Sequence, residues 1–512
     1  MEETPRRPLS RRAMLRAALG GLSAAVLAAC GQQAAAPAPT AAPAAEPTAA
    51  PAATAAPAAT AAPAATAAPA ATAAPAATAA PAPTNTPLPL PEGAAGKLTV
   101  IHRTEYFENA QTIFRTTAEK YAADNGITLD ISTANPEAFG DFNAKMQAAV
   151  QAGNPPDVAY HAISIQQMYF LDLLEDVSDV VEELVSQYGQ FVPLSAEMNA
   201  KIDGKWWAVP FQSNAGGTFV RGDILSAAGI DPKTLDTWDK RRDAALAVSD
   251  PSKEMWGWGF TTNRSGDGHG FITDVIQAFG GRFVDETGEK VTFKSAETVE
   301  AVTWLQETYT SDKYKPMLPP GVESWTDTSN NENFLAGKIA FTQNAFSVYA
   351  QSKRDSVPFF KDIVFLRKPV SNAGEVLESG ASMWFTVFKG SQNVDAAKAF
   401  IKHMIAPEQF IPIVKEAGGL LMPAYANMWT DEVVGIDPNF STLKEIIFNE
   451  TKYTGQAYPA QPNAAVDAIN AQSILSQMMA NVLNGSMTPE QAVDDANTKI
   501  VQIFEELGLP QG

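Results

Sequence analysis

The sequence predicts an α/β protein whose folded part, residues 96–512, forms two lobes around a central cleft. Strand-like and helix-like segments alternate over residues 97–161, which is typical of a parallel sheet with right-handed crossovers. A second observation is the stretch from Gly204 to Asp239, where two apolar runs flank a flexible polar break. A chain that crosses from one lobe to another through a hinge needs such a break. The folded part is also long enough for two cores.

The first lobe is expected to begin with three strands and two helices. Alternating apolar residues predict strands at 97–102, 128–132 and 157–161, and helical spacing predicts helices at 108–125 and 141–151. Ligands bind beyond the carboxyl ends of parallel strands. The residues that follow the first and third strands are therefore expected in one wall of the cleft.

The stretch from Gly204 to Asp239 is interpreted as the first passage between lobes. Trp206 to Val209 is typical of a buried strand, and Pro210 is expected to end it because proline has no N–H to donate. A polar patch and then Gly216–Gly217 follow, where backbone freedom is greatest. Thr218 to Arg221 predicts the next strand. An ordinary bulged hairpin within one domain remains an alternative on these residues alone.

Glycine and capping signals define the later elements. Ser265 to Gly270 is interpreted as a glycine-rich loop, but it is not a phosphate cradle because no Lys-Ser/Thr follows. A helix is expected from Ser295 to Tyr309 and an apolar strand over 380–388. Asn393 is expected to cap the next helix. Thr488-Pro-Glu-Gln491 predicts a capping box that opens the final helix.

The first thirty residues are interpreted as an export signal with a lipid anchor. Ser10 to Arg16 contains a twin-arginine pattern, and the apolar segment that follows is too short for a permanent membrane helix. Leu27-Ala28-Ala29-Cys30 resembles a lipobox, so Cys30 is the expected lipidation site. Cys30 is also the only cysteine, which leaves the mature protein without disulfides or thiolate sites. Whether export follows the twin-arginine or the Sec route remains open.

Residues 31–95 are expected to form a disordered tether. Proline recurs every six residues from Pro51 to Pro81 among alanines and threonines, which excludes a stable helix and leaves no apolar face. Such a segment would hold the folded part at a distance from the membrane. Whether its threonines carry sugars remains open.

Charge and motif content exclude several functions. A net charge of −20 argues against nucleic acid as a partner. The four histidines lie in separate segments, and the chain contains no H-E-x-x-H, G-x-S-x-G or P-loop pattern. We therefore expect no catalytic residue, no metal and no cofactor. We also expect the protein to be a monomer. A carboxylate pair for glycoside hydrolysis is not excluded by counting acidic residues.

Four motifs carry a family resemblance. Lys205-Trp-Trp-Ala-Val-Pro-Phe, Phe219-Val-Arg, Ala228-Gly-Ile and Thr237-Trp-Asp occur in this order and resemble the extracellular solute-binding proteins of carbohydrate ABC transporters (family 1, maltose-binding-protein-like). The resemblance covers roughly residues 97–512. It implies a periplasmic-binding-protein-like fold with discontinuous lobes. It also implies a receptor, anchored to the outer face of the bacterial cell membrane, that delivers a sugar or oligosaccharide to a membrane permease.

The lobes implied by this resemblance are joined by three passages, expected near Pro210, near Trp384 and near Asn427. Lobe one would contain about 97–209 and 385–426, and lobe two about 210–384 and 427–512.

A sugar site needs flat apolar surfaces for C–H faces and fixed polar groups for hydroxyls. Strand ends and the positions that line the cleft in this family supply the candidates. The aromatic candidates are Tyr106, Tyr160, Phe346, Trp384 and Tyr425. The polar candidates are Arg103, Glu105, His161, Asn214, His269, Asn344 and Asn463. The family often has tryptophan where this chain has Phe346, which argues against a maltodextrin-like ligand, and the sequence does not name the sugar.

Two other functions remain open at this stage. One is a cell-surface glycoside hydrolase, which would turn over its substrate and carry two carboxylates facing each other across the cleft. The other is a carbohydrate- or peptide-binding lipoprotein without a role in transport. A transport receptor would instead bind a small solute, close around it and leave it chemically unchanged.

Overall fold

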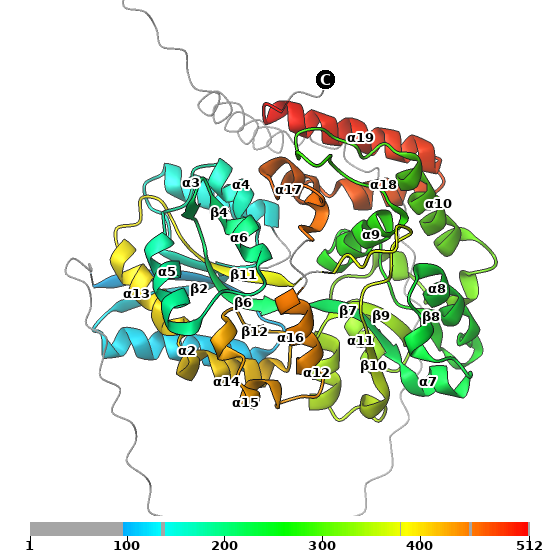
Figure 1. Cartoon of the computed structure of the whole chain (residues 1–512), viewed down its shortest axis with the longest axis horizontal. Coiled ribbons are helices and arrows are strands. Elements are labelled where there is room, and N and C mark those ends of the chain that lie inside the picture. Colours follow the sequence, from blue (N-terminus) through cyan, green and yellow to red (C-terminus); the bar gives the residue numbers. More distant parts are fainter. Residues whose placement is uncertain (1–95, 135–138, 379, 450–452, 510–512) are drawn as a thin grey trace, which may run out of the picture. The chain divides into compact units, whose positions relative to one another are not determined.

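The structure is a computed structural model that describes residues 96–134, 139–378, 380–449 and 453–509. The expected export signal, Cys30 and the tether lie outside these residues. The described part is a mixed α/β fold with a six-stranded and a four-stranded sheet, each flanked by helices (Figure 1). Within the described ranges, no helix is both long enough and apolar enough to cross a membrane.

The first lobe is built on the six-stranded sheet, whose strand order is β12-β6-β11-β3-β1-β2. Its strands are β1 (Lys97–Arg103), β2 (Thr128–Ala134), β3 (Val158–His161), β6 (Val209–Asn214), β11 (Ala381–Val387) and β12 (Met422–Pro423). The first three pair in parallel, as the alternation in the sequence predicts, while β11 and β12 pair antiparallel to their neighbours. The expected beginning of the fold is confirmed.

Helices surround this sheet. They are α2 (Glu108–Asp124), α3 (Phe139–Gln151), α4 (Ile165–Phe170), α5 (Ser178–Tyr188), α6 (Ser195–Ala200), α13 (Val394–Ile405), α14 (Pro407–Ala417), α15 (Asp431–Val434) and α16 (Phe440–Asn449). Asn393 occupies the predicted N-cap position of α13, but its side chain makes no capping bond; its amide instead lies 3.3 Å from both carboxylate oxygens of Asp157. A short hairpin, β4 (Lys201–Ile202) and β5 (Lys205–Trp206), precedes β6.

The second lobe is built on the four-stranded sheet, whose strand order is β10-β7-β9-β8. Its strands are β7 (Gly216–Arg221), β8 (Trp256–Trp258), β9 (Ile339–Ala345) and β10 (Ile363–Leu366). Its helices are α7 (Gly222–Ala227), α8 (Trp238–Ala247), α9 (Gly266–Phe279), α10 (Ala296–Thr310), α11 (Ser329–Leu335), α12 (Ser347–Arg354), α17 (Ala464–Ala471), α18 (Ile474–Leu483) and α19 (Pro489–Glu506). The capping box at Thr488 is confirmed, since both reciprocal bonds with Gln491 are present.

Pro210 does not end a strand, contrary to the prediction. It lies inside β6, where the register with β11 shifts so that Met383 pairs with Gln212 and Trp384 with Pro210. This irregularity lets a residue without an N–H sit within the sheet. The strand predicted at 206–209 is correspondingly divided between β5 and β6.

The glycine pair after β6 is needed for close packing rather than for backbone freedom. A Cβ on Gly217 would lie 2.5 Å from the carbonyl oxygen of Leu366, and one on Gly216 would lie 2.9 Å from that of Asn344. Both carbonyl groups belong to neighbouring strands of the same sheet. Glycine therefore allows β7 to lie between β9 and β10.

Two passages of the chain connect the two sheets, and a third segment leads from α16 to α17. The first falls at Ala215, between β6 and β7, and the second between β10 and β11. After the second return, α16 packs against β6 of the six-stranded sheet, whereas Ala457 and the buried residues of α17 to α19 belong to a hydrophobic cluster that contains no residue of that sheet. We therefore propose lobe boundaries near Ala215, between Leu366 and Ala381, and after Asn449.

The segment interpreted as a glycine-rich loop is in fact the first turn of α9. Ser265 caps this helix by accepting a hydrogen bond from the backbone of Gly268, and Asp327 accepts from the backbone N–H groups of Gly266 and Asp267. Three glycines in one turn obscure the helical pattern, because glycine is a poor helix former. This correction matters for the site, since it turns His269 into a helical residue.

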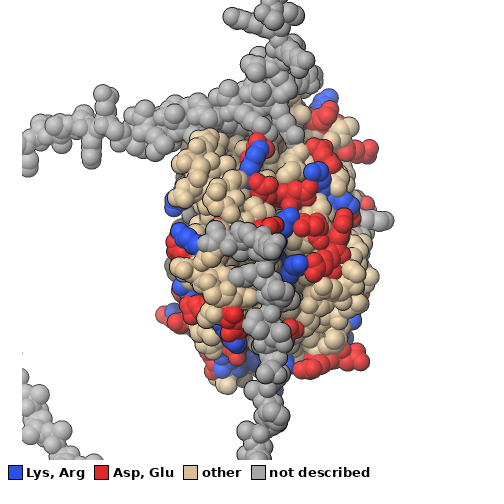
Figure 2. Space-filling view, turned by 90° about the vertical axis from the view of Figure 1, so that its left-hand side faces the viewer, with Lys and Arg blue, Asp and Glu red and all other residues tan. Residues whose placement is uncertain are grey.

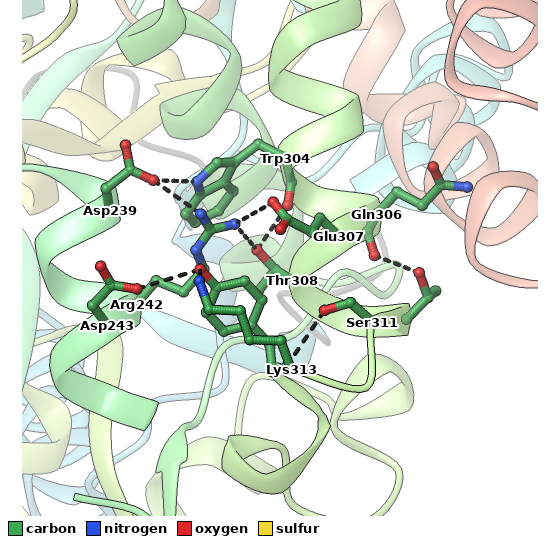
Figure 3. A network of polar contacts seen from close by, with 11 residues as sticks. Asp239, Arg242, Asp243, Trp304, Gln306, Glu307, Thr308, Ser311 and Lys313 are labelled. Atoms are coloured by element: carbon green, nitrogen blue, oxygen red, sulfur yellow. Dashed lines mark hydrogen bonds and ion pairs between the residues drawn. The ribbon is translucent and has the colours of Figure 1, made fainter. Parts of the chain in front are cut away.

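A buried arginine joins α8 to α10 in the second lobe (Figure 3). The Arg242 guanidinium contacts Asp239 at 3.1 Å and Glu307 at 3.2 Å, and it donates to Thr308 at 3.2 Å. It also lies over the rings of Trp304 and Tyr314, at 4.5 Å and 4.2 Å from their centroids. These contacts fix the helix pair that carries much of the second core.

The surface is acidic and mixed in charge. Figure 2 shows the face on the left of Figure 1, where acidic side chains outnumber basic ones and the two kinds are interspersed. Ion pairs such as Lys398 with Asp179 and Lys402 with Glu183 link α13 to α5 in this lobe. Where described residues form this face, the basic side chains make no continuous surface of the kind that binds a phosphate backbone.

Candidate functional site

A cavity of about 420 Å³ lies between elements of the two lobes. This volume is within the range of small-molecule sites. The first lobe contributes Asn143 on α3, the segment 162–164, Gln167 on α4, Ser195 and Asn199 on α6, and 380–382 with Trp384 on β11. The second lobe contributes His269, Gly270, Thr273 and Asp274 on α9, Lys368, the segment 453–456, and Asp467, Asn470 and Ala471 on α17.

Local periodicity explains which side chains reach the cavity. On β11, Ser382 and Trp384 are two residues apart and so share one face of the strand, while Met383 faces the other way. On α9, His269 and Thr273 are four residues apart and share one face of the helix.

Four polar atoms in the cavity wall have no hydrogen-bond partner among the described residues. They are Asn143 Oδ1, Thr273 Oγ1, Ser382 Oγ and Gln456 Nε2. In the two amide side chains, the second polar atom already has a protein partner: Asn143 Nδ2 donates to Gln167 at 2.6 Å, and Gln456 Oε1 lies 3.3 Å from His269 Nε2. A buried polar atom without a partner is costly, so these atoms mark places where a ligand or water belongs.

One ion pair lies in the wall. Lys368 Nζ is 2.8 Å from Asp274 Oδ1, and Asp274 Oδ2 accepts from Gln343 at 2.9 Å. Burial acts to lower the pKa of Lys368, but the Asp274 carboxylate outweighs burial and the pKa is raised. Lys368 also lies 5.2 Å from the ring centroid of Tyr453. This lysine is therefore a charged, fixed group rather than a free cation.

Two further groups in the wall are shifted towards their neutral forms. Burial lowers the pKa of His269 to about 4, so the imidazole is neutral at pH 7. Burial raises the pKa of Asp467 to about 7, although hydrogen bonds from Ser164 and Gln167 act in the opposite direction. The cavity thus presents mainly uncharged hydrogen-bonding groups.

Of the candidates named from the sequence, His269 and Trp384 line the cavity. Trp384 is nevertheless only 4% exposed, so most of its indole is packed behind the cavity surface and does not offer an open face on which a sugar ring could stack.

Three other candidates come together in a separate polar cluster. The Tyr160 hydroxyl donates a hydrogen bond to Glu105 and lies 2.9 Å from the Gln212 side chain, and the Arg103 side chain lies 3.6 Å from Glu105 and 3.3 Å from the sulfur of Met383. Since Met383 lies on the face of β11 opposite to Ser382 and Trp384, this cluster is on the other side of that strand from the cavity wall.

The remaining candidates lie outside the cavity wall. Phe346 and Tyr425 are fully buried, and the ring of Phe346 packs against Phe219 and Phe365. His161 bonds Thr386 and the backbone of Ile163 inside the first lobe. The Asn344 side chain forms hydrogen bonds with Asn331 and Ser347. Asn463 caps α17, and Asn214 is the last residue of β6. Tyr106 is 36% exposed, and its ring contacts the ring of Phe107.

Sequence reasoning missed most of the polar wall. Thr273 and Asp274 follow the segment 265–270, whose three glycines conceal the start of the helix that carries them. Asn143 lies on the predicted helix 141–151, and Gln167 lies on a short helix that follows the predicted strand 157–161. Nothing in the spacing of these two residues distinguishes them from solvated residues. Lys368 and Gln456 lie in irregular segments between elements, where periodicity gives no signal. In the described part of the chain, no group of three or more potential metal ligands occurs.

Comparison with known proteins gives one family match. A family model described as "Bacterial extracellular solute-binding protein" matches residues 116–442. Among characterised relatives, the maltotriose-binding protein of Pyrococcus abyssi is 24% identical over 358 residues, which cover 68% of this chain and 70% of that protein. The mannitol-binding protein of Pseudomonas aeruginosa is 23% identical over 332 residues, covering 60% of this chain and 72% of that protein.

Solved structures with the same fold include the maltose-bound MalE3 protein of T. maritima. It superposes with a TM-score of 0.67 at 19% identity and covers 79% of this chain and 98% of its own. A solute-binding protein of Agrobacterium vitis with bound D-mannitol has a TM-score of 0.66 at 19% identity and covers 80% and 99%. At this identity the likeness establishes the two-lobe fold.

Proposed function

The chain belongs to the bacterial extracellular solute-binding proteins, and from that membership we propose that it is the extracytoplasmic receptor of an ABC importer for a neutral sugar or oligosaccharide. The proposed binding site is the cavity between the lobes. Its ligand would be handed unchanged to a membrane permease. The relatives that bind maltotriose and mannitol support a polyhydroxylated ligand.

The observation that carries this proposal is the chemistry of the four unpartnered atoms. Asn143 Oδ1 accepts a hydrogen bond, Gln456 Nε2 donates one, and the hydroxyl groups of Thr273 and Ser382 do both. A sugar hydroxyl also donates and accepts, so it satisfies all four. A carboxylate or phosphate only accepts, and an ammonium group only donates. The donor–acceptor mixture therefore favours an uncharged polyol over an acidic or amino sugar.

The position of these atoms supports capture by both lobes. Asn143 and Ser382 belong to the first lobe, whereas Thr273 and Gln456 belong to the second. A ligand that bonds both pairs binds the closed arrangement better than an open one, and so shifts the population towards closure.

A non-enzymatic role follows from the family, whose similar characterised members are named as binding proteins. The Asp274 carboxylate in the cavity is paired with Lys368 and Gln343, which leaves it a poor proton donor or nucleophile. After incubation, the ligand should be recovered chemically unchanged. Turnover of a glycoside would contradict the proposal.

Anchoring remains a proposal from the sequence. Cys30 would be lipidated after removal of the preceding segment, and the tether 31–95 would separate the receptor from the membrane. Labelled palmitate should appear on the wild-type protein and not on Cys30→Ser.

Calorimetry and thermal shift test the binding function. The panel is maltotriose, mannitol, glucuronate, glucosamine and a tripeptide, and a ligand that binds the folded state raises the melting temperature. We expect a neutral compound to bind. Thr273→Val should then weaken binding about tenfold with little loss of stability, because its hydroxyl has no protein partner.

Thr308→Val is the matched control. Its hydroxyl is equally buried but donates to Trp304 and accepts from Arg242, so its removal should lower stability and leave affinity unchanged. Preferential binding of glucuronate, glucosamine or the peptide would refute the neutral-sugar assignment.

A further inference from the structure

The two lobes are joined on the cavity side by a hydrogen-bonded carboxyl group. Helix α17 of the second lobe packs against α4 of the first. Across this contact Ser164 Oγ donates to Asp467 Oδ2, and the backbone N–H of Gln167 donates to the same carboxyl group. Asp467 and Ser164 both line the cavity.

We propose that Asp467 and the Ser164–Gln167 turn form a proton-linked latch, which holds the lobes together over the cavity and makes closure take up a proton. The inference rests on the proposed function, because it concerns the closure of the same site. It adds pH regulation to that function: because closure takes up a proton, the affinity for the solute should be higher at acidic pH.

The latch has this property because the half-buried carboxyl group lies between α17 and α4, accepts hydrogen bonds only from uncharged donors and has no ion pair with a cation among the described residues. The surrounding elements carry His269 and Asp274 on α9, Lys368, Tyr453, Tyr169 on α4, and the Asp495–Lys499 pair on α19, while α18 has no ionisable side chain. Lys368 is engaged by Asp274, and Tyr169 bonds Asp203. Burial raises the pKa of Asp467 to about 7, with no charged group contributing to the shift.

The sign of the effect follows from linkage. Separation of α17 from α4 would return Asp467 to water, where an aspartate has a pKa of about 3.9. The closed form therefore binds a proton that the open form lacks between about pH 4 and pH 7. Closure is fully favoured below this window, weakens by up to about tenfold for each pH unit within it, and is constant above pH 7.

Distance measurements between the lobes test the latch without a ligand. Spin labels at Glu182→Cys on α5 and Gln472→Cys beside α17, in a Cys30→Ser background of the full chain, report the separation by double electron–electron resonance. The short-distance population of the wild type should fall as the pH rises from 4.5 to 7. Asp467→Asn should keep that population high at every pH, because its amide is never charged.

Two further variants sharpen the test. Ser164→Ala removes one of the hydrogen bonds that hold Asp467 across the contact, so the short-distance population should be lower than that of the wild type at each pH. Asp312→Asn removes an exposed carboxylate elsewhere in the second lobe and should behave as the wild type. Circular dichroism at each pH confirms that every variant remains folded.

The outcomes separate this inference from the proposed function. A distance distribution that does not change with pH, or an Asp467→Asn variant that keeps the wild-type pH dependence, overturns the latch even where a sugar binds. A pH-dependent distance that Asp467→Asn abolishes supports the latch even where no compound of the sugar panel binds.

Discussion

Trp384 on β11 lies directly opposite His161 on β3 in the antiparallel register. The two residues are 4% and 3% exposed, yet only Trp384 reaches the cavity wall. Strand β11 thus carries a cavity-lining side chain at a position that is fixed by the sheet. Sites built on such rigid elements hold their geometry well.

We expect Trp384→Ala to lower both stability and affinity. The side chain is packed in the first core, and truncating a buried tryptophan typically costs about 3–5 kcal/mol. Urea unfolding gives the stability change, and calorimetry with the bound sugar gives the affinity. A variant that loses affinity while its unfolding free energy is unchanged would show that the indole is not packed as described.

Acid should destabilise the protein through His161. Burial lowers the pKa of His161 to about 3, well below the value of about 6.5 expected in the unfolded chain. The neutral imidazole therefore contributes stability that is complete above about pH 6.5 and is lost as the pH falls towards 3, at up to about 1.4 kcal/mol per pH unit.

His161→Gln cannot titrate, so its unfolding free energy should depend less steeply on pH over this window. Chemical denaturation from pH 4 to pH 7 measures the difference between the two slopes. Equal slopes would mean that His161 is not the titrating group.

The Lys368–Asp274 pair should matter more than surface pairs. Lys368→Met leaves a largely buried carboxylate without its cation, which we expect to cost about 2–3 kcal/mol. Lys120→Met, which breaks an exposed pair with Asp124, should cost about 0.5 kcal/mol or less. Because the pKa of Lys368 is raised, its contribution should persist up to about pH 10.4 and decline only above that value.

Two glycines should respond oppositely to alanine. A Cβ on Gly257 would lie 1.9 Å from the carbonyl oxygen of Ala245, so Gly257→Ala should cost about 3 kcal/mol or more. A Cβ on Gly270 would meet no atom within 4 Å, and Gly270→Ala should stabilise α9 by up to about 1 kcal/mol. Thermal unfolding of the two variants measures both changes in stability. A Gly270→Ala variant that is less stable than the wild type would contradict the assignment of Gly270 to the first turns of α9.

The Arg242 network should be structural. Arg242→Met loses two ring contacts and the hydrogen bond to Thr308, at an expected cost of about 2–3 kcal/mol, while binding affinity remains unchanged (Figure 3). Lys313→Met, which changes an exposed residue of the same network, should be within about 0.5 kcal/mol of the wild type. A loss of affinity in Arg242→Met would mean that the network also supports the site.

The sequence predicted the fold better than the site. Strand and helix periodicity locates β1 to β3, α2 and α3, because those segments bury one clear face. It fails at Pro210, where an irregular register accommodates proline, and at Gly266–Gly270, where three glycines conceal a helix. Both failures come from tertiary contacts that override a local preference.

The site was harder because its polar groups look like surface residues in the sequence. Asn143, Thr273 and Gln456 have ordinary neighbours, and only the packing of two lobes makes their atoms both buried and unpartnered. The aromatic candidates show the converse. Phe346 and Tyr425 are predicted to stack on a ligand, but both side chains are fully buried in the hydrophobic core.

The passages between the two lobes also set the order in which the protein can fold during synthesis. Strand β3 pairs with β11, which is made more than two hundred residues later, and α10 contacts α19, the last helix among the described residues. Neither lobe can therefore finish on the ribosome as an independent unit. Completion of the second lobe must await synthesis of α19, so a nascent chain that stops short of α19 leaves apolar surface of this lobe exposed to chaperones and proteases.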